Sequence, residues 1–367
     1  MNTGFARFLR KKDDFVKVYR VGICVFSAAA ICLCGLYKAG NFFTASNLRS
    51  ITLGESAGFQ LIAAKEKNYV VDNKSLYNDE VYLVEEEKNE SETESRPVKK
   101  GAYPILSLDM SGGAQKGEIL INDTDSGVEV DAEALVSAPF PKSLDGEAVT
   151  ALATMQKPLV LIIHTHATEC YSIQGADSYD NETSFRTENK EENIVSVGKV
   201  LCDTLNSRGV STIHCDILHD AKDYNSSYNN SLESVKYYLN KYPSIKYVFD
   251  IHRDAIIRDN GELIKTECTV DSHTVAQIMI LVGTNSGGAD HPLWTDNLNV
   301  ALKLQKNLTS SYPCLARPVN LRAASFNQQY APGSLLFEIG SCGNTLSEAK
   351  LAAVYLGEAL AEVIKET

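Results

Sequence analysis

Residues 158–169 have the sequence PLVLIIHTHATE, an apolar run followed directly by polar residues. Residues 159–163 are uniformly apolar, and a short apolar run of this kind predicts a strand buried on both faces of a sheet. His164, His166 and Glu169 follow that run directly. A buried strand that ends in two imidazoles and a carboxylate predicts a functional site at the edge of the sheet.

Strands and helices alternate on the C-terminal side of this stretch. A Thr345-Leu346-Ser347-Glu348 capping box opens the last helix, and Asp259-Asn260-Gly261 predicts a hairpin turn. The alternation predicts an α/β fold with a mainly parallel twisted sheet flanked by helices. Apolar runs predict strands at residues 210–214, 246–251, 275–282 and 334–339, and helical spacing predicts helices at 193–208, 232–242, 297–312 and 345–365.

Three of the predicted strands lead to side chains that can carry out hydrolysis. His164 follows the first strand, His252 follows 246–251, and Glu338 lies within 334–339. A catalytic zinc site needs imidazole nitrogens and a carboxylate oxygen, and it leaves one position open for water. Two histidines and one glutamate from neighbouring strand ends provide this set, and a further carboxylate such as Glu338 can transfer the proton of the attacking water.

The N-terminal part differs in composition from the rest of the chain. Residues 21–37 contain no charged side chain, and the first 38 residues carry seven Lys or Arg against two acidic residues. By the positive-inside rule, this predicts a cytoplasmic basic tail at 1–20 and a transmembrane anchor at 21–37. A linker or stalk follows at 38–156, including an acidic tract at 85–96, and a catalytic domain at 157–367 lies outside. The net charge of −12 argues against general nucleic-acid binding.

The cysteines and a few polar residues raise further possibilities. The six cysteines beyond residue 38 form no CxxC pair, so we expect mostly free thiols rather than a metal site. Cys170, next to Glu169 and near His166, allows a cysteine hydrolase, although no orienting third group is visible. Arg253, Asn327 and Gln328 are candidate substrate-binding residues.

Several motifs in one order resemble the stage II sporulation protein P family of endospore-forming bacteria. An anchor precedes them, and the resemblance covers residues 157–366. The motifs are HTHATE (164–169), NIVSVGKVLCDTLNSRGV (193–210), DIHRDA (250–255), LVGTN (281–285), FNQ (326–328) and LLFEIGSCGNT (335–345).

The resemblance implies a zinc-dependent hydrolase whose fold is similar to that of N-acetylmuramoyl-L-alanine amidases. Such an enzyme would cut the amide between the lactyl group of N-acetylmuramic acid and L-alanine, and also peptide crosslinks, during engulfment of the forespore. The implied partners are peptidoglycan, a lytic transglycosylase (stage II sporulation protein D) and the membrane protein stage II sporulation protein M. The implied location is the intermembrane space of the sporulating cell.

Residue by residue, the resemblance assigns the metal to His164, Glu169 and His252 and the catalytic role to Glu338. His166 is an alternative to His164. Related amidases place a ligand glutamate at the start of the following helix, so Glu169 also has competitors. These alternative carboxylates are Glu188, Glu191 and Glu192.

Two other functions fit the same residues. A metallo-endopeptidase would cut only the peptide crosslinks, with the same ligands. A catalytically inactive scaffold would bind the wall without cleaving it, and the intact set of histidines and carboxylates argues against this reading.

Overall fold

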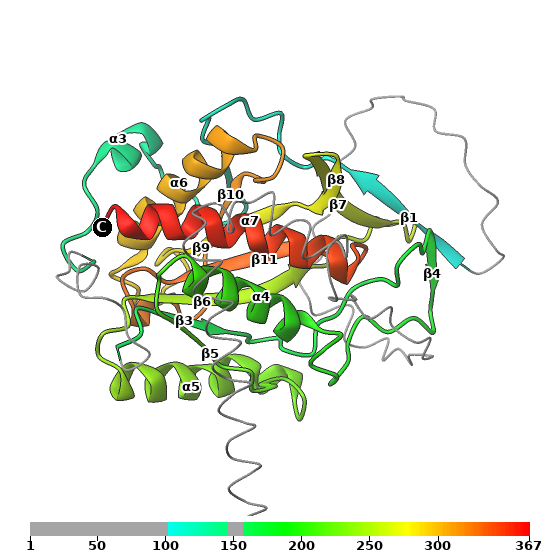
Figure 1. Cartoon of the computed structure of the whole chain (residues 1–367), viewed down its shortest axis with the longest axis horizontal. Coiled ribbons are helices and arrows are strands. Elements are labelled where there is room, and N and C mark those ends of the chain that lie inside the picture. Colours follow the sequence, from blue (N-terminus) through cyan, green and yellow to red (C-terminus); the bar gives the residue numbers. More distant parts are fainter. Residues whose placement is uncertain (1–101, 145–156) are drawn as a thin grey trace, which may run out of the picture. The chain divides into compact units, whose positions relative to one another are not determined.

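The computed structural model describes residues 102–144 and 157–367 (Figure 1). The predicted basic tail, anchor and acidic tract lie outside these residues. Among the helices that the structure describes, none has the length and apolar character needed to span a membrane.

The largest sheet has seven strands in the order β2-β10-β9-β11-β6-β3-β5. Only β9 and β11 pair antiparallel within it, and the other neighbours are parallel. The predicted α/β fold is therefore confirmed, but the sheet is mixed. Its strands are β2 (Ile121–Asp123), β3 (Val160–Ile163), β5 (Thr212–His214), β6 (Tyr247–Asp254), β9 (Ile278–Gly283), β10 (Val319–Arg322) and β11 (Leu335–Ser341).

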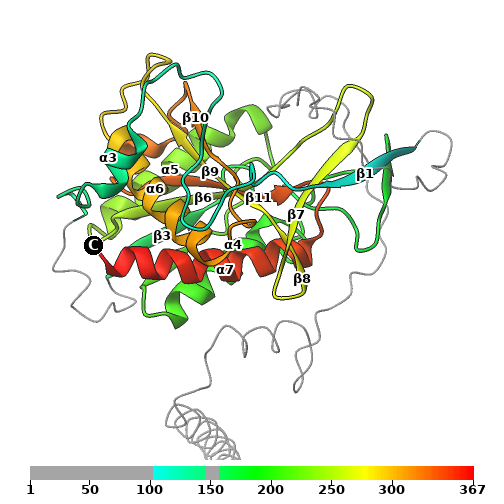
Figure 2. The same ribbon diagram turned by 90° about the horizontal axis from the view of Figure 1, so that it is seen from above.

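A second sheet of four strands, which the sequence did not predict, has the order β4-β1-β7-β8. Figure 2 shows the β7–β8 hairpin and β1 beside the large sheet. The predicted strand 275–282 is wrong as a single element, because it divides at Gln277 between β8 and β9. The buried Gln277 side chain donates to the Cys314 carbonyl and accepts from Met110 N, which fixes the chain as it passes from one sheet to the other. The strands are β1 (Ala102–Leu108), β4 (Ser178–Asp180), β7 (Leu263–Val270) and β8 (His273–Ala276).

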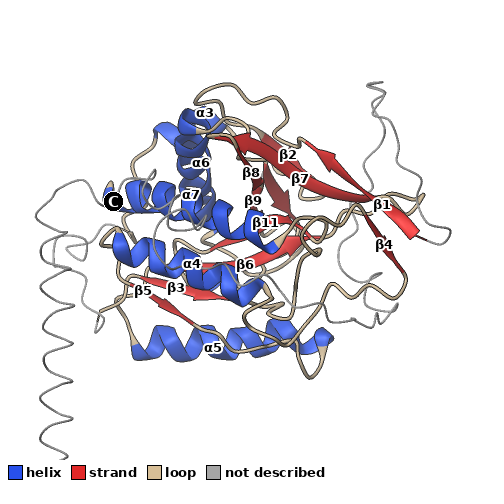
Figure 3. Ribbon diagram, turned by 45° about the vertical axis from the view of Figure 1, so that its right-hand side comes forward, coloured by secondary structure: helices blue, strands red, loops and turns tan. Residues whose placement is uncertain are grey.

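Helices cover both faces of the large sheet. Figure 3 shows α5 on one side of β3 and β5 and α4 on the other. Alternating side chains of β3 explain this arrangement: Val160 and Ile162 join the large core under α4, α6 and α7, whereas Leu161 and Ile163 pack toward α5. The helices are α3 (Ala132–Ser137), α4 (Ile194–Ser207), α5 (Ser227–Lys241), α6 (Trp294–Ser311) and α7 (Leu346–Lys365), with short 3-10 turns η1 (Tyr224–Ser226) and η2 (Gln328–Tyr330).

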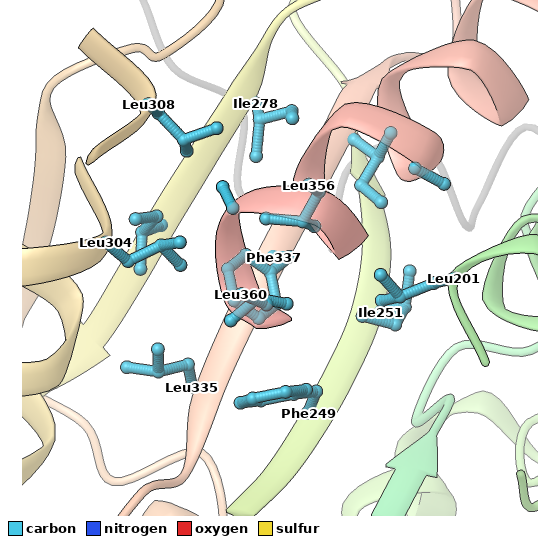
Figure 4. Close-up of a cluster of buried hydrophobic side chains, with 14 of the residues drawn as sticks. Leu201, Phe249, Ile251, Ile278, Leu304, Leu308, Leu335, Phe337, Leu356 and Leu360 are labelled. Carbon is cyan, nitrogen blue, oxygen red and sulfur yellow. The ribbon is translucent and has the colours of Figure 1, made fainter. Parts of the chain in front are cut away.

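The large core holds β6 and β11 in fixed positions. Phe249 and Phe337 from these two strands meet edge to face with ring centroids 5.4 Å apart. Figure 4 shows them together with Leu356 and Leu360 of α7. Burying such apolar side chains stabilises the fold by about 1.5–3 kcal/mol each. This packing gives the two strands that carry His252 and Glu338 a rigid support.

Local signals place the ends of α4 and α7 where the sequence predicts them, whereas α5 and α6 begin at Ser227 and Trp294, before the predicted starts at 232 and 297. Asn193 caps α4 by accepting from Val195 N, and the predicted capping box of Thr345 and Glu348 at α7 is confirmed. The predicted Asp259–Gly261 turn is also present, since Ile257 pairs antiparallel with Leu263 across it and Gly261 has φ +86°.

Residues before the predicted catalytic domain take part in both sheets. β1 pairs with β7, β2 pairs with β10, and α3 packs near α6, where the Leu135 carbonyl accepts from Asn299. The sheets thus begin upstream of the expected boundary at residue 157. The short apolar stretches at 103–108 and 117–122 pair with β7 and β10, which lie far away in the sequence. No local pattern therefore predicts that they join a sheet.

Candidate active site

The centre of the candidate site is the pair His252 and Glu338, which lie opposite each other on adjacent parallel strands. The β6–β11 register matches Glu338 with His252, and the β6–β3 register matches Ile163 with Asp250. The chain that leaves β3 therefore passes beside His252. Glu338 lies in the middle of β11 rather than at its end, and the strand is irregular between Glu338 and Ser341.

Carboxylates lie on both sides of the buried His252 ring. Its Nε2 is 3.0 Å from Asp250 Oδ1, and its Nδ1 is 3.7 Å from Glu169 Oε2. Burial would lower the pKa of His252, but the charges of Asp250, Glu169 and Glu338 outweigh this effect and raise it to about 10. The carboxylates around the ring therefore stabilise a positive charge at this position.

Asp250 also fixes the HTH segment. Its carboxylate accepts from Thr165 N at 2.8 Å and from Thr165 Oγ1 at 2.5 Å. Burial would raise the pKa of Asp250, whereas the charge of His252 and the hydrogen bonds from Thr165 lower it to about 2. One buried carboxylate thus joins the segment after β3 to the histidine of β6.

Glu169 is held by the residue that follows His252. Arg253 N donates to Glu169 Oε2 at 3.1 Å, and the Arg253 guanidinium lies 3.8 Å from Glu169 Oε1. That guanidinium also donates to the carbonyls of Cys170 and Phe185. Arg253, a predicted substrate-binding residue, is buried and positions Glu169 in this structure.

Glu338 has the environment of a proton-transfer group. Its Oε2 atom is buried and makes no hydrogen bond. Burial, with the nearby charge of Asp254, raises the pKa of Glu338 well above its usual value, and His252 opposes this shift. Asp254 itself is neutralised by Arg317, whose Nη1 lies 2.7 Å from Asp254 Oδ2.

The two histidines of the HTH motif have different surroundings. His166 lies beside His252 with ring centroids 5.3 Å apart, and Tyr224 stacks on its other side at 4.4 Å. His164 instead contacts the Ile251 carbonyl through Nδ1 at 3.0 Å and His214 Nε2 through its own Nε2 at 2.8 Å. The geometry favours His166 over His164 as the histidine that acts with His252.

Among the competing carboxylates, Glu169 lies 3.7 Å from His252 Nδ1. Glu188 and Glu191 are exposed and Glu192 is partly exposed, whereas Glu169 is buried. Cys170 is also buried, and burial raises the pKa of its thiol to about 12. A thiol of this kind is a poor nucleophile, so the structure argues against the cysteine hydrolase.

The two remaining predicted substrate-binding residues make contacts within the fold. Gln328 accepts from Gly283 N and donates to the Leu281 carbonyl, which ties η2 to β9. Asn327 donates to the Tyr228 carbonyl and adopts a left-handed backbone conformation with φ +59°. Both residues position loops in this structure.

The residue types at this site are those that bind zinc in proteins. His166 and Glu169 each lie beside His252, and Glu338 Oε2 nearby is buried without a hydrogen-bond partner. Within residues 102–144 and 157–367, no three His, Cys, Asp or Glu side chains are arranged as a metal-binding group.

Comparison of the sequence with known families gives a match over most of the chain. The sequence model of the stage II sporulation protein P family matches residues 46–361. The chain belongs to this family. The resemblance noted from the motifs is thereby confirmed.

A curated member of the family is stage II sporulation protein P of Bacillus subtilis (strain 168), which is 27% identical over 226 residues. The alignment covers 58% of this chain and 52% of the relative, so the chain spans about half the length of that protein.

Solved structures with some similarity include N-acetylmuramoyl-L-alanine amidases. The enzyme from Clostridium difficile 630 is 13% identical, with a TM-score of 0.33, over 57% of this chain and 95% of that chain. AmiC2 of Nostoc punctiforme is also 13% identical, with a TM-score of 0.30, over 56% and 94%.

Several residues of the candidate site were not predicted from the sequence. Asp250 could have been found, because it lies two positions before His252 and therefore on the same face of the strand. Asp254 could have been found in the same way. Tyr224 and Arg317 are far from the motifs in sequence, and no local signal indicates them.

Proposed function

We propose that this protein is a membrane-anchored, zinc-dependent peptidoglycan hydrolase. Its target would be the amide between the lactyl group of N-acetylmuramic acid and L-alanine, with peptide crosslinks as a second possible substrate. The observation that carries the proposal is the position of Glu338 opposite His252, with its Oε2 atom buried and Glu169 and His166 on the other sides of the His252 ring. Membership of the stage II sporulation protein P family supports it.

Zinc would be held by His252, Glu169 and His166, with His166 in place of His164. When bound, zinc would supply an activated water and polarise the scissile carbonyl. Asp250 would orient His252 through Nε2, so that Nδ1 faces Glu169.

Glu338 would act as the general base and then as the general acid. It would accept a proton from the attacking water and deliver it to the nitrogen of the leaving L-alanine. The raised pKa of Glu338 suits the second step, in which the protonated carboxyl group gives its proton to the leaving nitrogen. Arg317, whose Nη1 lies 2.7 Å from Asp254 Oδ2, would compensate the negative charge of Asp254 near Glu338.

The proposal also includes the location of the protein in the cell and its partners. The anchor at 21–37 would place residues 39–367 in the intermembrane space during engulfment of the forespore. Stage II sporulation proteins D and M would be its partners there. A reporter fused before Arg10 should resist external protease, whereas one fused after Thr367 should be cleaved, and the reverse pattern would overturn the topology.

Digestion of purified muropeptides by the full chain tests the activity. Mass spectrometry that detects whole stem peptides released from the glycan would support the amidase. Release of cleaved crosslinks with the stems still attached to the glycan would favour the metallo-endopeptidase. Binding to the wall without cleavage by zinc-loaded protein would favour the inactive scaffold, and an enzyme that keeps full activity without zinc would refute the metal mechanism.

A further inference from the structure

The connection between β5 and α5, residues 215–226, lies against the segment that carries His166. Three of its side chains contact every second residue of 164–168. The pairs are His219 with His164, Tyr224 with His166, and Asp220 with Thr168. A connection far away in the sequence thus determines the shape of the segment that follows β3.

Asp220 holds the part of this segment that follows His166. Its buried carboxylate accepts from Thr168 N at 3.0 Å and from Thr168 Oγ1 at 2.7 Å. Arg186 Nη1 donates to the same carboxylate at 2.9 Å and compensates its charge. Hydrogen bonds to an ionised acceptor are roughly twice as strong as those between neutral groups. Asp220 therefore fixes the backbone two residues after His166.

The part of the segment before His166 is held in the same way. Asp250 accepts from N and Oγ1 of Thr165, just as Asp220 does from Thr168. The buried His219 ring donates through Nδ1 to the His164 carbonyl at 2.7 Å, and its Nε2 lies 2.8 Å from Ser234 Oγ of α5. The backbone on each side of His166 is therefore fixed by a buried carboxylate.

Tyr224 holds the ring of His166. The two rings stack with their centroids 4.4 Å apart and their planes 10° apart. The Arg186 guanidinium lies over the Tyr224 ring at 4.6 Å from its centroid, so that one cation contacts both Asp220 and Tyr224. A stacked neighbour restricts rotation of the imidazole, which lies beside His252 with centroids 5.3 Å apart.

We propose that the β5–α5 connection positions His166 for binding zinc, with Asp220 and Tyr224 as its positioning residues. The inference rests on the proposed function, because it takes His166 as a zinc ligand. Asp220 fixes the backbone next to His166, Tyr224 fixes its ring, and Arg186 joins the two. A side chain that is already held in its binding orientation loses less conformational freedom on binding, so its affinity for the metal is higher.

A purely structural role of the same contacts predicts a different result. Contacts that only stabilise the fold would lower the melting temperature of the zinc-free protein, and they would reduce zinc binding only in proportion to the folded fraction. A positioning residue changes the zinc affinity of the folded protein. Tyr224 separates the two cases, because it is partly exposed and lies outside the clusters that form the hydrophobic core.

The test measures the zinc affinity of the purified full chain by chelator titration, and its melting temperature with and without zinc. Tyr224→Ala should weaken zinc affinity about 10–100-fold, the usual cost of losing a group that orients a ligand. Zinc should then raise the melting temperature less than in wild type, while the zinc-free proteins melt alike. Tyr224→Phe, which keeps the stacked ring, should restore the affinity. Asp220→Asn, which removes the charge shared by Thr168 and Arg186, should weaken it.

Two matched controls change the same residue types at exposed positions. Asp216→Asn alters a carboxylate of the same connection that pairs with Lys190 at the surface, and Tyr237→Ala removes an exposed ring of α5. Both should bind zinc as wild type does.

Three results would overturn the inference and leave the proposed function intact. They are wild-type zinc affinity in folded Tyr224→Ala and Asp220→Asn proteins, a Tyr224→Phe protein as weak as Tyr224→Ala, and variants whose zinc binding falls only with their folded fraction. Wild-type protein that binds no zinc would overturn the proposed function itself, and the inference with it.

Discussion

The substitution Glu338→Gln separates a catalytic from a structural role for the carboxylate opposite His252. Glutamine keeps the size of the side chain but cannot accept the proton of an attacking water. General acid–base help contributes about 10²–10⁴-fold to rates. Its loss corresponds to about 3–5 kcal/mol of activation free energy. We therefore expect muropeptide cleavage to fall by this factor while zinc content stays the same.

The structure also sets the expected effect on stability. Glu338 Oε2 makes no hydrogen bond, and burial and the charge of Asp254 raise the pKa of Glu338. An acid whose pKa is raised by folding destabilises the native state at any pH above its unfolded-state value, because ionising it then costs more in the folded protein. Removing this acid should leave the melting temperature at neutral pH unchanged or higher.

The assay measures melting, zinc content and muropeptide cleavage on the same preparations of wild type, Glu338→Gln and the exposed control Glu233→Gln. The control should match wild type in all three. A Glu338→Gln protein that melts lower and loses activity only in proportion to its folded fraction would show that Glu338 is structural. A folded, zinc-loaded and active variant would remove Glu338 from the mechanism.

Four further substitutions test the surroundings of the site. The His166→Ala protein should lose most of its zinc with little change in melting temperature. The His164→Ala protein should keep its zinc but lose about 2–4 kcal/mol of folding stability, because the two buried contacts of His164 are removed. If metal analysis gave the opposite pattern, His164 would be the ligand. Asp250→Asn should weaken zinc affinity about 10–100-fold in a chelator titration, because His252 loses its orienting carboxylate, and unchanged affinity would refute that role. Gly198→Ala should destabilise the fold by about 1–3 kcal/mol in denaturant melts, since a Cβ there would lie 2.4 Å from the His164 ring, and wild-type stability would contradict this packing.

Local patterns were sufficient for much of the fold. Residues 159–163 form a buried strand because continuous apolar side chains must be covered on both faces, and Thr345 and Glu348 cap α7 through contacts within one turn. These features depend on residues close together in the chain. The order of strands and the split of 275–282 into β8 and β9 do not, because each depends on partners such as Met110 that lie far away in sequence.

The candidate site was also predicted only in part from the sequence. The sequence alone indicated that His252, Glu169 and Glu338 are functional, because ionisable side chains after or within buried strands need a partner or a function. It placed His252 and Glu338 at strand ends, whereas they lie inside β6 and β11. Which of His164 and His166 lies beside His252 was decided by tertiary structure: His214 and the Ile251 carbonyl hold His164, whereas Tyr224 stacks on His166 next to His252. Both histidines follow the same strand two residues apart, so only the long-range contacts distinguish them.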